Sequence, residues 1–306
     1  MTYSAGGTIQ ATDYNGLANV SAANVWYVLS TGSGTYGYGQ DAASISTVSA
    51  AATITATQWA GLVHSINKVL GHQGGAAAQL PTGGLGNIGI TAGATITAFA
   101  NVSTAVTAIG TNRLNFNSTR GTLVTGADFD ATFSTSTFTR TITVTFASAN
   151  QARYFFNGGG RFSLVFSPSG LTGNNKETSY TDLMNAVGTL HLDAETSTRT
   201  GTGETLTIDG LAVGYWDLTT SNQTILKLTS DNSTYTGNTL EVFMRVAGSA
   251  GTNGGLGTQV IYDITYTDGA DEAFDDAVSG TFRHRVDITP PETTFLANSW
   301  GVFGVS

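Results

Sequence analysis

The chain contains four histidines, and their positions limit the chemistry that they can support. His64 and His72 lie on either side of an expected helix end, at a spacing that does not make a metal-binding pair. His191 alternates with two leucines, which predicts that its side chain faces outward from a strand. His284 stands between two arginines. We expect none of the four to be a catalytic, cofactor-binding or metal-binding residue.

One acidic cluster and one scattered set of acids are candidate sites. Carboxylates at high density suit Ca²⁺, but the cluster lacks the alternating ligand spacing of a calcium loop, so a solvated hairpin tip is favoured and a calcium site stays the alternative. Glycoside hydrolysis needs two acids about 5 to 9.5 Å apart across a cleft, and nothing in the sequence pairs the scattered acids. The cluster comprises Asp268, Asp271, Glu272, Asp275 and Asp276, and the scattered set comprises Asp193, Glu195, Asp209 and Asp217.

Other signatures of catalysis are weak. No Gly-x-Ser-x-Gly elbow stands at a strand-to-helix turn, and no lysine follows a glycine-rich loop as in a nucleotide-binding site. Tyr215–Trp216 and Tyr154–Phe156 could stack on sugars, although core packing is the default explanation for aromatic residues in β patterns. We expect no enzyme activity, no cofactor and no bound metal.

Composition excludes several classes of protein. The chain has 306 residues, with 12 Lys and Arg against 21 Asp and Glu, so it lacks the basic face that phosphate recognition requires. No apolar run is long enough for a transmembrane helix, and the N-terminus does not resemble a secretory signal. The absence of cysteine fits assembly in a reducing cytoplasm. Only 11% of residues are charged, which fits either a subunit covered by neighbours or a free-standing Thr-rich β protein.

Charge and repetition divide the chain into two predicted domains. Residues 1–112 contain only three charged residues, Asp13, Asp41 and Lys68, and the other charged residues follow from Arg113 onward. Within this first part, Gly7–Leu17 aligns with Ala52–Leu62, and a fainter third copy begins at Ala94. Isoleucines of the three copies (Ile9, Ile54 and Ile96) lie 45 and 42 residues apart. Such a period is typical of a repeated supersecondary unit, so we predict a helical repeat attachment region over 1–112.

Each copy predicts a short extended stretch followed by an amphipathic helix. The first helix should begin at the N-cap Thr12 and stop near Ser30, and the second should run from the N-cap Thr57 to Gly71. Short amphipathic helices bury little alone, so these must pack on each other or on a partner subunit. The second and third apolar stripes comprise Trp59, Leu62, Val63, Ile66, Val69 and Leu70, then Val102, Val106 and Ile109 before Gly110.

Two low-complexity loops lie between these helices, at Thr31–Gln40 and Gly71–Gly89. Their glycine and serine content also fits disordered linkers. The tyrosines Tyr36 and Tyr38 favour an ordered loop that docks on another surface.

From Asn115 onward the pattern predicts β structure, and the fold class is therefore α+β. Phe138–Phe146 alternates with period two, and Arg161–Phe166 is separated from Tyr154–Phe156 by the hairpin signal Asn157–Gly160. About ten strands with polar turns predict a mainly antiparallel β-sandwich, jelly-roll-like, over 113–306. The other predicted elements are strands at 189–193, 204–208, 212–218, 224–229, 240–247, 260–267, 281–288 and 300–305, and a helix at 180–187, with Pro290–Pro291 forcing an extended path.

Two motifs together resemble a known family. The first is the repeated Thr-Ile-x-Ala-Thr-x-(Tyr or Trp)-x-Gly-Leu segment, followed by Gly32–Gln40 in one copy and by Gly71–Gly75 in the next; the second is Ala152–Phe162. Both resemble virion structural proteins of tailed bacteriophages, particularly of marine and cyanobacterial phages, often labelled tail or tail-fibre-like. The resemblance spans residues 3 to about 166 and extends loosely to Asn298–Gly301. It implies a tail, baseplate or neck component within a symmetric assembly, and it has no catalytic residues to transfer.

Three functions fit these features. The first is a structural tail protein that assembles through its charge-poor N-terminal region, with other copies of itself and other virion proteins as partners. Its apolar stripes and glycine-rich loops would then be buried by neighbours, and it would be located in the virion after assembly in the host cytoplasm. The second is a host-receptor-binding adhesin whose β domain contacts a surface glycan. The third, a glycan-degrading enzyme, requires an acid pair in a cleft.

Overall fold

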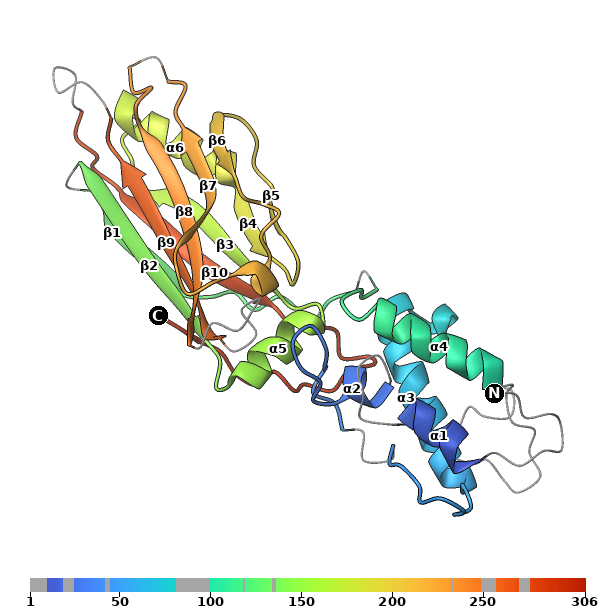
Figure 1. Ribbon diagram of the computed structural model, residues 1–306. Coiled ribbons are helices and arrows are strands. Elements are labelled where there is room, and N and C mark those ends of the chain that lie inside the picture. The colour runs from blue at the N-terminus through green and yellow to red at the C-terminus, as the bar shows by residue number, and fades with distance from the viewer. Residues whose placement is uncertain are drawn as a thin grey trace. The chain divides into compact units, whose positions relative to one another are not determined.

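The computed structural model describes residues 10–18, 25–41, 45–80, 99–117, 119–133, 136–232, 234–248, 257–269 and 276–306 (Figure 1). About 29% of the chain is helix and 30% is strand in two antiparallel sheets, which confirms the α+β class. The chain forms two compact units. Unit 1 comprises Met1–Gly121, Arg153–Gly159 and Pro291–Trp300, and unit 2 comprises Thr122–Ala152, Gly160–Pro290 and Gly301–Ser306. The division after residue 112, which rests on composition, stays a prediction.

The described helices of unit 1 cover one another's apolar faces. The helix α3 contacts α2 and α4, and α2 also contacts α1. The apolar stripes of the second and third predicted helices are buried within this chain, so neighbouring subunits are not needed to cover them, contrary to one of our expectations. The helices are α1 (Ala11–Ala18), α2 (Val25–Leu29), α3 (Ala56–Gly74), the 3-10 turn η1 (Ala76–Ala78) and α4 (Phe99–Thr111).

The starts of two helices differ from the prediction by one or two residues. Thr55, not Thr57, caps α3: its hydroxyl accepts from the backbone N–H of Gln58, whose side chain accepts in return from the N–H of Thr55. This reciprocal pair satisfies two N–H groups that have no partner inside the helix, which is why the cap forms there. At α1, the carbonyl of Gln10 accepts from Asp13 and Tyr14, so Thr12 lies inside the first turn.

Two predicted helix ends were also wrong. The helix α3 continues through Gly71 to Gly74, where the N–H of Gly75 bonds to the carbonyl of Gly71. The helix α4 contains Gly110. Glycine inside a helix is less favourable than alanine by only about 1 kcal/mol. The packing of the buried residues before and after Gly71 and Gly110 outweighs this cost.

The loop 31–40 is ordered and docked, as Tyr36 and Tyr38 suggested. Tyr38 is buried, and its hydroxyl donates to the carbonyl of Arg113 at 2.7 Å. Tyr36 contacts the ring of Tyr27, with ring centroids 5.2 Å apart. Much of the second loop lies outside the described residues, as do the extended stretches of the first and third repeats that contain Ile9 and Ile96.

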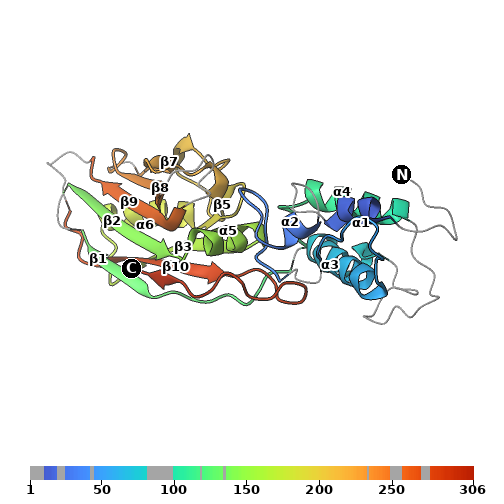
Figure 2. The ribbon, with the colours of Figure 1, turned by 60° about the horizontal axis from the view of Figure 1, so that its bottom comes forward.

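Unit 2 contains the two sheets (Figures 1 and 2). Every strand pair in them is antiparallel, and β3 and β10 pair along their whole length from Arg161 and Thr289 to Ser169 and Thr281. Sheet A has the strand order β1 (Asp128–Thr132), β10 (Thr281–Thr289), β3 (Arg161–Ser169), β4 (Thr189–Leu192) and β5 (Ser197–Arg199). Sheet B has the order β11 (Gly304–Val305), β2 (Thr137–Thr145), β9 (Gly257–Thr267), β8 (Thr239–Gly248), β7 (Gln223–Thr229) and β6 (Thr205–Asp209).

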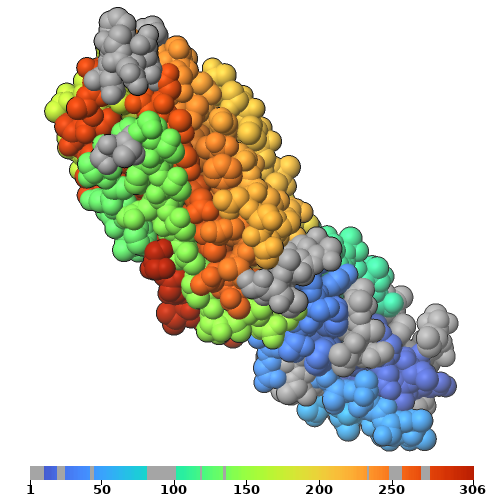
Figure 3. Space-filling view, turned by 60° about the vertical axis from the view of Figure 1, so that its left-hand side comes forward, coloured from blue at the N-terminus to red at the C-terminus, as the bar shows by residue number. Residues whose placement is uncertain are grey.

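Alternation along the strands builds the core of unit 2. Leu240, Val242 and Met244 of β8 are buried at every second position, as period-two patterning requires. The two sheets contact each other through aromatic rings, with the centroids of Tyr266 on β9 and Phe282 on β10 only 4.7 Å apart. Figure 3 shows one face of sheet B, on which the strand colours follow the order of the sheet.

The helix α6 (Asn175–Val187) contacts strands of both sheets, namely β3, β7 and β8. It begins five residues earlier than predicted, because the side chain of Asn174 caps it by accepting from the N–H of Glu177. Tyr180 on its buried face meets Phe282 with ring centroids 5.4 Å apart.

Three predicted strands were wrong. Tyr154–Phe156 belongs to the helix α5 (Ala149–Asn157), which ends where the N–H of Gly158 bonds to the carbonyl of Tyr154 and Gly159 takes a φ of 87°. Residues 212–218 form a turn and the 3-10 helix η2 (Tyr215–Asp217). Of 300–305 only β11 is a strand, because Gly301 adopts a φ of 73° that interrupts an extended chain. The strands β1 and β5 were not predicted.

Candidate functional site

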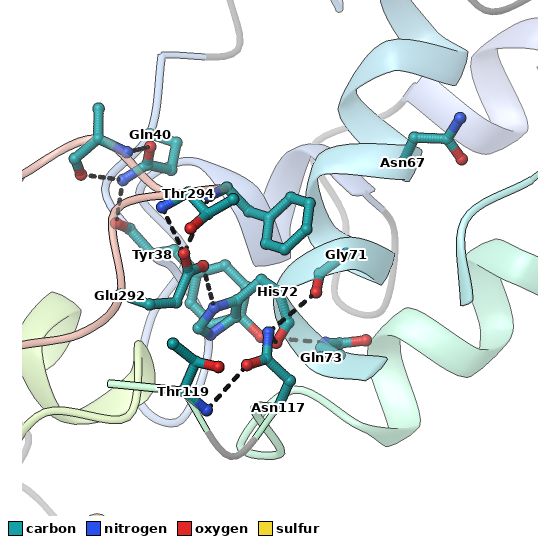
Figure 4. A network of polar contacts seen from close by, with 12 residues as sticks. Tyr38, Gln40, Asn67, Gly71, His72, Gln73, Asn117, Thr119, Glu292 and Thr294 are labelled. Carbon is teal, nitrogen blue, oxygen red and sulfur yellow. Dashed lines mark hydrogen bonds and ion pairs between the residues drawn. The ribbon is translucent and has the colours of Figure 1, made fainter. Parts of the chain in front are cut away.

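A buried network of polar side chains lies in unit 1, around the last turn of α3 (Figure 4). Its centre is His72, whose Nδ1 lies 3.0 Å from Oε1 of Glu292. The side chains of these two residues are 0% and 2% exposed. A carboxylate next to an imidazole fixes the orientation of the ring.

Local folding explains the position of each partner. The amphipathic stripe of α3 turns His72 inward, and the side chain of Asn117 donates to the carbonyls of Gly71 and His72 at this helix end. The backbone N–H of Asn117 also donates to the carbonyl of His72 at 2.8 Å. These bonds satisfy carbonyl groups of the last turn that have no partner within the helix.

Glu292 is held by its own chain as well as by His72. Its Oε2 accepts from the backbone N–H groups of Thr294 and Phe295, so that a tight turn forms around the carboxylate. Burial raises the pKa of Glu292, but the hydrogen bond with His72 and those from the turn outweigh it and leave the pKa below the ordinary value.

Tyr38 and Gln40 extend the network. The ring of Tyr38 meets the ring of His72 edge-on, and its hydroxyl accepts from Nε2 of Gln73 at 3.0 Å. Burial raises the pKa of Tyr38, which is therefore a neutral donor. Gln40 bonds both backbone groups of Ala297, accepting from its N–H at 2.7 Å and donating to its carbonyl at 2.8 Å.

The network joins four chain segments rather than presenting a reactive group. Imidazole and carboxylate are the groups of a general base, but both are enclosed by protein, and Nε2 of His72 has no hydrogen-bond partner in the part of the chain that the structure describes. The pair therefore acts as a crosslink that holds α3, the loop 36–40, Asn117 and the segment 292–297 together.

A hollow of about 370 Å³ opens beside the network. One wall is the face of α3 with His64, Asn67 and Lys68, and the facing wall is the loop Thr293–Ala297. Gln79 also lines the hollow. Figure 4 shows Asn67 on α3 and Thr294 on the facing loop.

A second hollow, of about 540 Å³, lies in unit 2 where β5 and the chain that follows β6 meet. The N–H of Ser197 bonds to the carbonyl of Leu211, which fixes this meeting point. Five polar residues and two apolar ones line the hollow, namely Thr196, Ser197, Thr198, Arg199 and Asp209 with Leu211 and Ala212. The hydroxyls of Thr196 and Ser197 already donate to the backbone carbonyls of Leu211 and Val213.

Unit 2 also contains a buried carboxylate, on Glu177 near the start of α6. Its Oε2 accepts from the N–H and hydroxyl of Thr172 and from the N–H of Gly173, while Oε1 accepts from the N–H and hydroxyl of Ser279. Burial raises the pKa of Glu177, but these hydrogen bonds, led by those from Ser279, bring it down to about 2. The carboxylate thus ties two loops to the helix start.

The four histidines are dispersed. His64 is exposed and lines the hollow beside α3, whereas His72 is in the buried network. His191 is half-buried and its Nδ1 lies 2.8 Å from the hydroxyl of Ser163, so it does not simply face outward. His284 is buried, and its Nε2 lies 2.8 Å from the hydroxyl of Tyr266.

Three of the four scattered acids have separate structural partners. Asp193 accepts two parallel hydrogen bonds from Arg161, at 2.6 and 2.9 Å. Asp217 accepts from the N–H of Gly214, and Asp209 accepts from the N–H of Leu211. Glu195 is exposed on the surface. The geometry of each of the first three is that of a turn or a salt bridge.

The acidic cluster lies partly outside the described residues, which include only Asp268 and Asp276 of its members. Asp268 forms a salt bridge with Lys176, and Asp276 accepts from the hydroxyl of Tyr235 at 2.9 Å. Within the described ranges, His, Asp and Glu side chains do not gather in threes as a metal site would require.

The aromatic candidates are core residues. Tyr215, Trp216, Phe155 and Phe156 are at most 3% exposed, and Tyr154 is 8% exposed. Such rings are not available for stacking on an external sugar. Among the residues that the structure describes, no helix is long and apolar enough to cross a membrane.

Comparison of the chain with protein-family models, with curated proteins and with solved structures found no match.

Glu292 and Glu177 were not among the residues predicted from the sequence. For Glu177 a signal was available, because an Asn three residues before a Glu is a capping pattern, and it predicts a helix start at Asn174. For Glu292 no local pattern exists, since its main partner is 220 residues away in the chain.

Proposed function

We propose that this protein is a structural component of a phage virion, associated with the tail, fibre or baseplate, and that it assembles through its charge-poor N-terminal region. The resemblance of the repeated motif and of Ala152–Phe162 to phage virion proteins supports this proposal, as does the low charge of residues 1–112. In the same proposal, residues 1–112 are an attachment region and the two sheets of unit 2 form a jelly-roll-like sandwich.

The exposed but uncharged segment Ser46–Gln58 is the observation that carries the proposal. Every residue in it is exposed or half-exposed, and none is charged. Monomeric proteins keep charges on their surfaces to remain soluble and separate. A run of exposed alanine, serine and threonine without charge suits close contact with a neighbouring subunit. Since the helices bury their own apolar stripes, we assign the contact to this segment rather than to the stripes.

Charge substitutions on this segment test the proposal better than a deletion. Phe155 and Phe156 are buried and belong to the same unit as residues 1–112. Removal of residues 1–112 would therefore expose these two rings. The double variant Ala50→Glu/Thr53→Glu instead adds two carboxylates at exposed positions. The oligomeric state of the full-length chain would be measured by size-exclusion chromatography with light scattering.

We expect the wild type to form a defined oligomer, and the double variant to dissociate with an unchanged circular dichroism spectrum. The control Thr202→Glu/Thr220→Glu, which adds the same charge to exposed positions of unit 2, should leave the oligomer intact. A wild type that stays monomeric at every concentration would contradict the assembly proposal.

A second candidate function is that of a tail adhesin that binds a host glycan. The hollow between β5 and Asp209 favours it, because the hydroxyl of Thr198, the guanidinium of Arg199 and the carboxylate of Asp209 are groups that bond sugar hydroxyls, and Leu211 and Ala212 add apolar contact. Asp209→Ala and Thr198→Ala should reduce adsorption to host cells while virions remain intact in electron micrographs. Unchanged adsorption by the double variant would remove this candidate.

A further inference from the structure

We propose that the hollow beside α3 is a binding site for a carboxylate group. The first ground is the placement of charge. Lys68 is the only Lys or Arg in residues 1–112, and its side chain lines this hollow. His64 lies one helical turn before it on the same face of α3. In a region that otherwise excludes cations, the lysine and an imidazole meet at one concave surface.

The walls of the hollow are held by hydrogen bonds that do not involve these two groups. Asn67 accepts from the N–H of Leu80 at 2.7 Å, and Gln79 donates to the carbonyl of Asn67 at 2.9 Å. These contacts fix Gln79, which lines the hollow, to α3. The hollow therefore has its shape before a ligand arrives, which reduces the ordering that binding requires.

The facing loop is fixed in the same way. Glu292 holds the N–H groups of Thr294 and Phe295, and Gln40 holds both backbone groups of Ala297. The ring of Phe295 rests against Gly71 of α3, where a Cβ atom would lie only 2.4 Å from it. The loop thus keeps its backbone donors occupied and offers hydroxyls and apolar side chains to the hollow.

The hydrogen-bond donors of the residues that line the hollow determine which ligand charge the hollow can balance. One ammonium, one imidazole and the hydroxyls of Thr293 and Thr294 suit a single negative charge. A phosphate dianion would need more backbone or guanidinium donors, and the nearby carboxylate of Asp41, which raises the pKa of Lys68, would repel a dianion more strongly than a monoanion. Phe295 and Leu296 on the facing wall suit a small apolar group next to the carboxylate.

Burial lowers the pKa of Lys68, which means that its ammonium is incompletely solvated. An anion in the hollow would supply the missing stabilisation. The same chemistry could come from a free organic acid or from an acidic side chain of a second copy of this chain, and the experiment below separates the two.

The test is a titration of ¹⁵N-labelled full-length protein with sodium butyrate, followed by NMR, with sodium phosphate at the same ionic strength as comparison. We expect saturable shifts of the amides of residues 293–297 with butyrate and weaker ones with phosphate. Lys68→Met, which keeps the length of the side chain, should weaken butyrate binding by about 10-fold or more. Lys227→Met, which removes a lysine paired with Glu241 in unit 2, should leave it unchanged.

A second experiment tests whether the carboxylate comes from an acidic side chain of another copy of the chain. If an acidic side chain of another copy occupies the hollow, the wild type should form an oligomer, and butyrate should dissociate that oligomer into monomers. The Lys68→Met variant should be monomeric even without butyrate. Lys68→Arg, which retains the charge, should restore binding in either arm and shows that the methionine variant failed for lack of charge. The proposal is overturned if neither saturable shifts nor butyrate-sensitive association is found, or if Lys68→Met behaves as wild type.

Discussion

Nδ1 of His72 lies 3.0 Å from Oε1 of Glu292, although the two residues are 220 positions apart in the chain. Both side chains are buried, and the same carboxylate accepts from two backbone N–H groups of the turn that follows it. The contact therefore connects the end of α3 to the segment 292–297 within unit 1. It makes a residue close to the end of the chain part of a unit that is otherwise built mainly from the first 121 residues.

Replacement of Glu292 should destabilise unit 1. Glu292→Gln keeps the size of the side chain but removes the negative charge, and it leaves buried N–H groups with a poorer acceptor. We expect a loss of about 1–3 kcal/mol in the free energy of unfolding. Urea denaturation followed by tryptophan fluorescence would measure it, because Trp59 is buried in the same unit. Glu195→Gln, at an exposed position, is the matched control and should change the free energy by less than about 0.5 kcal/mol.

Acid should destabilise unit 2 through Glu177. The pKa of this carboxyl is about 2 in the folded chain and about 4.5 when it is exposed, so the unfolded state binds a proton first. Its contribution to stability is complete above pH 4.5 and is lost as the pH falls toward 2. Glu177→Gln should be less stable at pH 7 and should lose less further stability over this range. Thermal unfolding from pH 7 to 2.5 would show parallel curves if Glu177 had no such role.

Much of the strand pattern could be predicted because period-two alternation survives in the sequence. The predicted strands at 224–229, 240–247 and 260–267 match β7, β8 and β9 to within a few residues. Each has a buried face that contacts many neighbours, so burial and sequence pattern agree. The apolar stripe of Trp59–Leu70 likewise predicted α3.

The features that could not be predicted from the sequence share one physical cause, which is that contacts between distant parts of the chain determine them. Tyr154–Phe156 reads as a strand by composition, but Ala152, Phe155 and Phe156 are all buried at helical spacing, and tertiary packing decides between the two. Neither the pairing of His72 with Glu292 nor the hollow beside α3 follows from local sequence, because each combines residues from the beginning and the end of the chain. Only the isolation of Lys68 in a charge-poor region was visible in advance.

Mild acid should act on unit 2 through His284. Burial, together with the charge of Arg140, lowers the pKa of this imidazole from 6.5 to about 4. The unfolded state therefore binds the proton first, and stability declines as the pH falls from 6.5 to 4, by at most about 3 kcal/mol. His284→Gln keeps a polar contact for Tyr266 without a titrating group and should flatten this part of the curve. A wild-type curve that is already flat between pH 6.5 and 4, or one that His284→Gln does not alter, would show that His284 is not its source.

Two glycines in the helices of unit 1 should respond to alanine with opposite signs. At Gly16 of α1 a Cβ atom would meet nothing within 4 Å, so Gly16→Ala should stabilise the helix by about 0.5–1 kcal/mol through a better helix propensity. At Gly71 of α3 the added atom would lie 2.4 Å from the ring of Phe295, so Gly71→Ala should displace that ring and destabilise unit 1 by about 1–3 kcal/mol. Because the propensity gain is the same at both positions, the difference between the two variants measures the packing of α3 against the segment 292–297. Urea denaturation of both variants gives that difference, and equal free energies of unfolding would mean that Phe295 does not rest on Gly71 in solution.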